Sequence, residues 1–431
     1  MHMECLNVND KGHLTIGGCD TVELMKEYGS PLYIMDESSI RGACRKFRDS
    51  IEKYYGGNGM MLYASKAFSC KEIYRVIDSE GCGADLVSGG ELYTALKAGF
   101  PMEKAFFHGN SKTRDELVLA LNSKVGRIVV DNIEELTLLN DIAGELNVTQ
   151  DVHLRIKPGV DAHTHNFILT GKIDSKFGFA LETGEAMQAV KAVSECGNLS
   201  LKGLHCHIGS QIFDTSPFVH TSEVMFSFMD KIRGDLGITI AELNLGGGFG
   251  IKYIDSDDPK PFESYMDKVS TTLKALCQKT NFPMPKVFIE PGRSITATAG
   301  ITLYTVRAVK EIPGIRNYIL IDGGMTDNPR YALYQCDYDA VIANKAALEC
   351  DYTATIGGRC CESGDLIQEN VKMQKPVAGD ICAVFCTGAY NYSMASNYNR
   401  VPKLPTIFVN NGQSRVVIKR ETYDDLIKND V

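Results

Sequence analysis

The sequence has no cluster of basic side chains, and its 431 residues carry a formal net charge of −9 at pH 7. Proteins that bind a polyanion group their Lys and Arg residues, so we expect no nucleic-acid partner. No apolar run approaches the roughly 20 residues that span a bilayer, so we expect no membrane partner either. The first five residues lack the basic and apolar blocks of a signal peptide.

The 14 cysteines do not have the spacing of metal ligands, as the adjacent Cys360 and Cys361 and the isolated Cys206 illustrate. Structural zinc is therefore not expected, and the thiols are predicted to be reduced. With no export signal, we predict a cytoplasmic protein. Internal repeats and low-complexity tracts are absent as well.

The composition is that of a folded globular protein, with 44% hydrophobic and 23% charged residues. At this length two domains are expected. Short apolar segments alternate with amphipathic ones, which predicts alternating strands and helices. The predicted strands are 60–66, 83–88, 104–109, 127–131, 152–157, 201–207, 241–246 and 286–290. The predicted helices are 37–55, 70–80, 89–99, 112–123, 132–146, 183–196, 216–236 and 260–280.

Eight strands that alternate with helices predict a parallel (β/α)8 TIM-like barrel, with an open doubly wound sheet as the alternative. After residue 290, segments rich in Val, Ile, Thr and Tyr predict an all-β domain. The strand-like pieces 13–16 and 32–35 have no partner in the barrel, so we expect them to complete the β domain. The predicted parts are 1–36 (N-terminal strands), 37–290 (barrel) and 291–431 (β domain).

Lys66 ends the first predicted barrel strand. Desolvation at the end of a buried strand favours the neutral amine, and a neutral amine can form a Schiff base with an aldehyde. The alternative is a lysine that extends its ammonium to solvent.

Two glycine-containing loops follow the last two predicted strands, at 246–250 and 290–293. Loops at these positions of a barrel often bind phosphate, because successive glycines let backbone N–H groups converge. Plain connecting loops are the alternative reading.

His205 and His207 alternate on the sixth strand towards the barrel mouth, with Ser210 in the loop that follows. A metal site is one reading, but we find no matching ligands at the other strand ends. We favour an imidazole stacked on a bound aromatic ring, with Ser210 donating to its phosphate. Glu290 can then face the ring nitrogen, unless it forms an ordinary salt bridge. Together these features predict pyridoxal 5'-phosphate as the cofactor and no metal.

Motifs along nearly the whole chain resemble those of the alanine-racemase-type (fold type III) pyridoxal-phosphate decarboxylases. They are Tyr63-Ala64-Ser65-Lys66-Ala67, Gly83-Ala84-Asp85, Ser88-Gly89-Gly90-Glu91, Ser175-Lys176-Phe177-Gly178, His207-Ile208-Gly209-Ser210-Gln211, 246–250, 290–293, Asp327-Asn328-Pro329-Arg330, Cys361-Glu362-Ser363-Gly364-Asp365 and Gly388-Ala389-Tyr390-Asn391-Tyr392. Asn391 departs from the pattern, since a different side chain is common there.

The resemblance implies that Lys66 holds the cofactor as an internal aldimine and that Cys361 protonates the quinonoid carbanion. It implies the following cofactor-binding residues: Lys66, Asp85, His207, Ser210, Gly247, Gly248, Glu290, Pro291, Gly292, Arg293 and Tyr390. It implies these substrate-binding residues: Arg293, Arg330, Tyr334, Glu362 and Tyr390. A thiol ordinarily has a pKa near 8.5 and is protonated at neutral pH, so it can act as an acid. A buried inert cysteine is the alternative.

In this family the segment with Cys361 and Glu362 reaches the other subunit's site, which implies a homodimer with shared active sites. Arg330 with Glu362 suits a substrate that has a carboxylate and an ammonium at its far end. The expected reaction is therefore decarboxylation of the amino acid meso-2,6-diaminopimelate to L-lysine and CO2. Decarboxylation of ornithine, lysine, arginine or carboxynorspermidine is the alternative within the family.

Two other classes remain possible from the residues: a Schiff-base aldolase without a cofactor, and a non-catalytic relative that binds a partner. A colourless purified protein indicates the aldolase, whereas loss of the lysine or the cysteine is usual in the non-catalytic relatives. Both residues are present here. The roles of Asp161, His163 and His165, after the fifth strand, stay open.

Overall fold

A computed structural model describes residues 3–160 and 174–431. The chain divides into two compact units. Of the described residues, one unit contains 43–160, 174–250 and 258–292, and the other contains 3–42, 251–257 and 293–431. Within the part described, no helix is long and apolar enough to cross a membrane. The domain limits at residues 36 and 290 stay a prediction.

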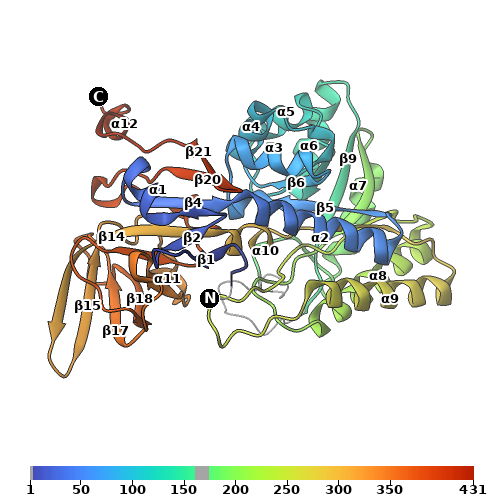
Figure 1. The fold of residues 1–431 in the computed structure, drawn as a ribbon. Helices are drawn as coiled ribbons and strands as arrows, with labels where there is room; N and C mark the ends of the chain where they lie inside the picture. The colour runs from blue at the N-terminus through green and yellow to red at the C-terminus, as the bar shows by residue number, and fades with distance from the viewer. Residues whose placement is uncertain (1–2, 161–173) are drawn as a thin grey trace. The chain divides into compact units, whose positions relative to one another are not determined.

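The first unit is a closed barrel of parallel strands, as predicted (Figure 1). Pairing of β8 with β9 closes the sheet, and the short β10 (Phe179–Ala180) adds to β9. The barrel strands are β5 (Gly59–Ala64), β6 (Gly83–Leu86), β7 (Ala105–Phe107), β8 (Arg127–Val130), β9 (Gln150–Lys157), β11 (Leu199–His205), β12 (Glu242–Asn244) and β13 (Lys286–Ile289). The open doubly wound sheet is therefore wrong.

The barrel helices also follow the predicted order, and α3 to α6 pack side by side in succession (Figure 1). They are α2 (Glu37–Tyr55), α3 (Lys71–Ser79), α4 (Gly89–Ala98), α5 (Arg114–Asn122), α6 (Ile133–Glu145), α7 (Glu185–Glu195), α8 (Ser216–Leu236) and α9 (Phe262–Thr280). Several begin at a side chain that caps the first turn: Ser88 accepts from Glu91 N–H, and Thr113 forms a capping box with Glu116. Local sequence therefore sets where these helices start.

The second unit is mainly β. The predicted strand at 32–35 completes its large sheet, as expected, whereas the piece at 13–16 does not join that sheet and pairs instead within a separate three-stranded sheet. β4 (Leu32–Asp36) lies in the interior of a sheet, between β14 and β20, in the strand order β18-β17-β15-β14-β4-β20-β21. The strands after the barrel are β14 (Gly300–Ile312), β15 (Arg316–Ile321), β16 (Ala340–Ile342), β17 (Tyr352–Gly357), β18 (Leu366–Met373), β19 (Ile381–Val384), β20 (Thr406–Asn410) and β21 (Gln413–Ile418).

In the part described, the second unit also contains a small sheet and four short α-helices. β1 (Leu6–Val8), β2 (Leu14–Ile16) and β3 (Cys19–Asp20) form a separate three-stranded sheet. The short helices are α1 (Thr21–Tyr28), α10 (Arg293–Thr296), α11 (Arg330–Tyr334) and α12 (Tyr423–Ile427).

The barrel interior combines an apolar cluster with an ion network. Leu62, Phe106, Val129 and Phe288 come from four strands and pack together. Glu242 on β12 accepts two hydrogen bonds from Arg127 on β8, at 2.9 and 2.7 Å. It also lies 2.7 Å from His153 Nε2 on β9. The network therefore links strands that are not neighbours in the sheet.

We expect this network to make the stability of the barrel depend on pH in the acid range. Burial acts to raise the pKa of Glu242, but Arg127 and His153 outweigh it and lower the pKa to about 2. A carboxyl whose pKa falls on folding stabilises the folded state above its unfolded pKa and loses that contribution as the pH falls through the folded value. The contribution is roughly 3 kcal/mol at neutral pH and is lost between about pH 4.5 and pH 2.

Chemical denaturation of wild-type protein and the Glu242→Gln variant at several pH values measures this contribution. The variant should be less stable at pH 7, and the difference should shrink towards pH 2. Substitution of the exposed Glu52 by Gln is the matched control and should leave the curve unchanged. A constant difference at all pH values means that Glu242 does not carry the dependence.

Candidate active site

Lys66 lies in a turn rather than on a strand. β5 ends at Ala64, whose N–H donates to Pro291 O at 3.1 Å, and Lys66 follows in the 3-10 turn η1 (Ser65–Ala67). The predicted strand was therefore two residues too long. The Lys66 side chain is exposed, so the expectation of a desolvated amine was also wrong. The turn moves the amine out of the buried strand. The chain packs tightly at the end of β5, since a Cβ at Gly292 would lie 2.9 Å from Ala64 O.

Glu91, at the start of α4, holds this turn. Its Oε2 accepts from Ser65 Oγ at 2.8 Å and from Val87 N–H at 2.7 Å. Burial raises the pKa of Glu91, and the charge of Lys66 opposes that rise. The sequence analysis named Glu91 only within a family motif. Its position in the first turn of a predicted helix, next to a strand end, could have indicated a role at the site.

Glu290, directly after β13, is the centre of a buried polar cluster. Its Oε1 accepts from Asn244 Nδ2 at 2.7 Å, and its Oε2 lies 3.0 Å from His205 Nε2. His108 Nε2 lies 2.9 Å from Oε1, outside hydrogen-bond geometry. Burial alone raises the pKa of Glu290, but His108 and His205 reverse this and bring it well below its ordinary value. Glu290 is therefore ionised.

The sequence predicted no further ligand residues at the other strand ends to match the histidines of the sixth strand, and that prediction is wrong. His108, after β7, and Glu290 lie with His205 such that one ligand atom from each falls within 4.8 Å of the others. Burial lowers the pKa of His205 to about 3, so its ring is neutral. The His205 ring nitrogen faces the carboxylate at hydrogen-bond distance instead of a shared central point, which favours a hydrogen-bonded cluster. His108 was missed, although a polar residue directly after a strand was a usable signal.

Asp85 on β6 lies beside the same cluster, with Oδ1 3.6 Å from His108 Nε2. Burial raises its pKa to about 6. In the part of the chain described, three buried atoms have no hydrogen-bond partner here: Asp85 Oδ1, His108 Nε2 and His205 Nδ1. A ligand with polar ring substituents fits such atoms, because unpaired buried polar groups are unfavourable.

His207 follows β11 and is partly buried. Gly247 N–H donates to His207 Nδ1 at 3.3 Å, which orients the ring and leaves Nε2 to carry the proton. Burial lowers the pKa of His207 well below its ordinary value, and the positive charges of Lys66 and Arg155 lower it further. The ring is therefore neutral and close to Lys66.

The predicted phosphate loops pack against each other after β11, β12 and β13. A Cβ at Gly247 would lie 2.1 Å from Glu290 O, and a Cβ at Gly248 would lie 2.5 Å from Gly209 O. Gly248 also has φ +108°, which side chains disfavour. Ser210 directly follows Gly209 in the loop after β11. These positions therefore have no room for a side chain, which is the condition under which backbone groups can approach a ligand closely.

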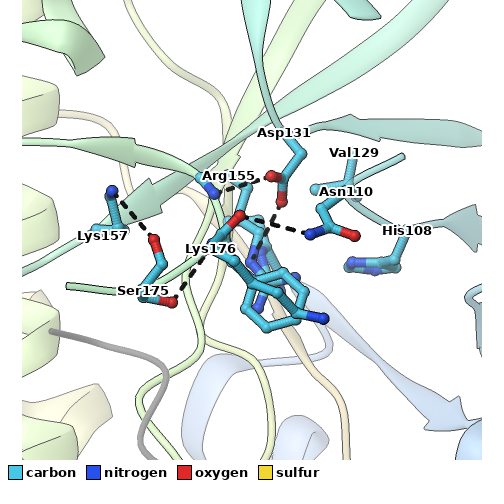
Figure 2. Close-up of polar contacts among 12 residues, drawn as sticks. His108, Asn110, Val129, Asp131, Arg155, Lys157, Ser175 and Lys176 are labelled. Carbon is cyan, nitrogen blue, oxygen red and sulfur yellow. Dashed lines mark hydrogen bonds and ion pairs between the residues drawn. The ribbon is translucent and has the colours of Figure 1, made fainter. Parts of the chain in front are cut away.

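Figure 2 shows polar contacts near the ends of β8 and β9 that involve Ser175 and Lys176. Gly178 N–H donates to Asp131 Oδ2 at 3.0 Å, and Arg155 Nε lies 3.9 Å from Asp131 Oδ1. The Arg155 guanidinium stacks 4.2 Å from the centroid of the Phe177 ring. The sequence assigned no role to the motif at 175–178, and these contacts show that it is fixed to the barrel.

The second unit brings together three of the predicted residues: Arg293, Arg330 and Tyr390. Both guanidiniums lie over the Tyr390 ring, at 4.8 and 5.4 Å from its centroid. Tyr390 has φ +69°, a strained value for this side chain. Both arginines also donate to Tyr253, which sequence reasoning missed and which no local signal marks. Tyr334 ends α11 and is half-buried.

Cys361 and Glu362 are exposed on a loop of the second unit. Asp365 shapes this loop: its Oδ2 accepts from Cys360 N–H at 2.6 Å and its Oδ1 accepts from Met325 N–H at 2.5 Å. The Cys361 backbone N–H donates to Asn399 Oδ1 at 2.8 Å. Within the described residues, no contact joins Cys361 or Glu362 to the arginines. Asp161, His163 and His165 lie outside the described residues.

The family model described as "Pyridoxal-dependent decarboxylase, pyridoxal binding domain" matches residues 37–297. The chain therefore belongs to the pyridoxal-dependent decarboxylases, and its cofactor is pyridoxal 5'-phosphate. The predicted family and cofactor are confirmed, and the cofactor-free aldolase is wrong.

Full-length relatives narrow the family. The chain is 48% identical over 423 residues to diaminopimelate decarboxylase of Bacillus subtilis (strain 168), covering 98% of this chain and 96% of the relative. It is 43% identical to the Staphylococcus aureus (strain COL) enzyme of the same name, covering 98% of each. The crystal structure of diaminopimelate decarboxylase from M. jannaschii in co-complex with L-lysine has a TM-score of 0.93 and 35% identity, covering 99% of this chain and 98% of that one. Within the pyridoxal-dependent decarboxylases, this chain is a member of the diaminopimelate decarboxylases, which are carboxy-lyases.

Proposed function

We propose that this enzyme decarboxylates meso-2,6-diaminopimelate to L-lysine and CO2. The observation that carries the substrate assignment is Arg330, a buried cation. Among the described residues it forms no ion pair, and it donates to Tyr253, Tyr338 and Cys336. A buried guanidinium with only neutral hydrogen-bonding groups suits an anionic ligand group. The distal carboxylate of diaminopimelate is such a group, and lysine, ornithine and arginine have no carboxylate there.

In this proposal most of the cofactor-binding residues belong to the barrel unit, and Arg293 and Tyr390 belong to the second unit. Lys66 would hold the cofactor covalently, and His207 would lie against its ring. The phosphate is held by Ser210, Gly247, Gly248, Pro291, Gly292, Arg293 and Tyr390. Support comes from the neutral, oriented His207 ring and from the close packing of the glycine loops. Pyridoxal phosphate, when bound, supplies an electron sink for the pair left by the broken C–C bond.

Glu290 holds a proton at the ring nitrogen in this assignment. Its ionised state and its buried surroundings support that role, because a desolvated carboxylate binds a proton-bearing nitrogen strongly. Asp85 lies beside the same carboxylate and provides a second polar contact at the ring.

At the substrate, Arg293, Arg330 and Tyr334 bind the distal carboxylate, Glu362 binds the distal ammonium, and Cys361 delivers the proton that replaces CO2. The exposure of Cys361 and Glu362 supports the idea that they serve the site of a second subunit in a homodimer. A cytoplasmic location remains a prediction from the cysteine usage.

Release of CO2 from meso-diaminopimelate, compared with lysine, ornithine and arginine, tests the proposal. We expect kcat/KM for diaminopimelate to exceed that for the other three by at least about 10³-fold, because each of them leaves the buried cation unpaired. Comparable rates with lysine or ornithine would mean that the enzyme acts on another basic amino acid.

A further inference from the structure

Tyr253 is the point at which the two arginines of the second unit meet. Arg293 Nη1 donates to Tyr253 Oη at 2.6 Å, and Arg330 Nη1 donates to the same oxygen at 2.9 Å. All three side chains are buried, with exposed fractions of 5% for Tyr253, 7% for Arg293 and 4% for Arg330. The distance between the two Nη1 atoms is therefore at most the sum of these two hydrogen-bond lengths. Two cations this close repel each other unless an anion joins them.

A chain of hydrogen bonds continues from Arg330. Its Nη1 also donates to Tyr338 Oη at 3.2 Å, and Tyr338 Oη donates to Asn391 Oδ1 at 3.3 Å. Burial raises the pKa of Tyr338, so the phenol keeps the proton that it donates. The rings of Tyr253 and Tyr338 pack edge to face, 5.6 Å apart. The two phenols thus support each other and fix the Arg330 guanidinium.

Asn391 is the last residue of this series of hydrogen bonds, and its side-chain N–H has no acceptor among the described residues. The residue is fully buried, its Oδ1 is taken by Tyr338, and its Nδ2 has no hydrogen-bond partner among the described residues. This N–H belongs to a residue two hydrogen bonds away from the Arg330 guanidinium, and its burial is unfavourable unless a ligand oxygen or a water accepts from it. The cluster offers N–H donors from three side chains, and an ionised carboxylate offers two acceptor oxygens with about four lone-pair sites.

We propose that Tyr253 is a positioning residue that sets the separation of the Arg293 and Arg330 guanidiniums so that both bind one carboxylate, to which Asn391 Nδ2 adds a further hydrogen bond. This inference rests on the proposed function, in which those arginines bind the distal carboxylate of the substrate. It adds two specificity-determining residues, Tyr253 and Asn391, to that site.

The Tyr253→Phe variant keeps the ring and removes the shared oxygen. We expect KM for meso-diaminopimelate to rise about 10- to 100-fold, the range for loss of a hydrogen bond to a charged group, while kcat changes less than about threefold. The visible absorption should stay as in the wild type, because Lys66 and Glu290 lie in the barrel unit and not in this cluster. Tyr352→Phe is the matched control, because Tyr352 is also a buried phenol of this unit, bonded to Glu311 at 3.2 Å. It should leave KM unchanged.

Two further variants separate this inference from the proposed function. Arg330→Gln tests the carboxylate site itself and should raise KM more than Tyr253→Phe does. The double variant should show less than the product of the two single effects, since the residues act together. Asn391→Ala should raise KM about three- to tenfold, and it tests the cluster independently if Tyr253→Phe does not fold.

The outcomes are distinct. If Arg330→Gln raises KM but Tyr253→Phe and Asn391→Ala stay within twofold of the wild type, the positioning role is wrong and the proposed function stands. If Arg330→Gln also leaves KM unchanged, the carboxylate site is wrong, and the inference fails with it. A Tyr253→Phe variant that loses kcat and cofactor absorption at unchanged KM overturns the inference in favour of a structural role.

Discussion

The Lys66→Ala variant is expected to lose turnover by on the order of 10⁴-fold or more, the scale seen when a covalent catalytic group is removed. Lys66 is the exposed amine in the turn after β5, close to His207 and Asp85. Without it, the cofactor has no covalent attachment at this position. Wild-type protein should show a visible absorption band that borohydride bleaches, and the variant should show no such band.

Lys71→Ala is the control for this experiment. Lys71 is exposed at the start of α3, five residues farther along the chain, and no role is assigned to it. The control should keep both the band and the turnover. Retention of the bleachable band in Lys66→Ala would show that another amine holds the cofactor and would remove the basis of the site assignment.

The second large effect is expected for Cys361→Ala. Loss of a positioned general acid reduces a rate by about 10²- to 10⁴-fold, so kcat should fall in that range. The absorption band and substrate binding should remain, because Cys361 lies on a loop of the second unit and not in the barrel. Steady-state kinetics together with the absorption spectrum measures both.

Cys360→Ala is the matched control, since the chain offers a neighbouring thiol. Cys360 is partly buried, and burial followed by the charge of Asp365 raises its pKa to about 11. We expect its replacement to change kcat only slightly. If Cys360→Ala lowers kcat as much as Cys361→Ala does, the loop conformation and not the thiol of Cys361 determines the rate.

Mixing the two inactive variants tests the shared site. In a mixed dimer of Lys66→Ala and Cys361→Ala subunits, one site contains both alterations and the other contains neither, provided that each site uses Lys66 of one subunit and Cys361 of its partner. Activity should therefore return on mixing. Heterodimers that form without activity would show that Cys361 acts within its own subunit.

The pattern of the barrel could be predicted from the sequence because local features determine it. Eight apolar segments separated by amphipathic ones predicted eight strands and their helices, and the structure shows local caps at helix starts such as those of Ser88 and Thr113. The end of β5 was less predictable. Its last paired residue, Ala64, is set by hydrogen bonding to β6 and to Pro291, contacts that the local sequence does not contain.

The residues of the candidate site also divide into those that the local sequence indicates and those that only tertiary contacts or family motifs reveal. Lys66, Glu290 and the glycine loops could be predicted because they end or follow predicted strands, and the ends of parallel strands meet on one side of a barrel. His108 obeyed that rule too but was overlooked. The family motifs supplied Arg330 and Cys361, whose chemistry alone indicated no function.

The sequence by itself determined the order of strands and helices, the pyridoxal-phosphate family and the residues at the strand ends, since these depend on periodicity and short motifs. Only the tertiary structure decided that His108 and His205 flank Glu290 and that Tyr253 joins Arg293 to Arg330. Those contacts connect residues about 40 to 180 positions apart. They form when the whole chain packs, and neither a short-range pattern nor a propensity encodes them.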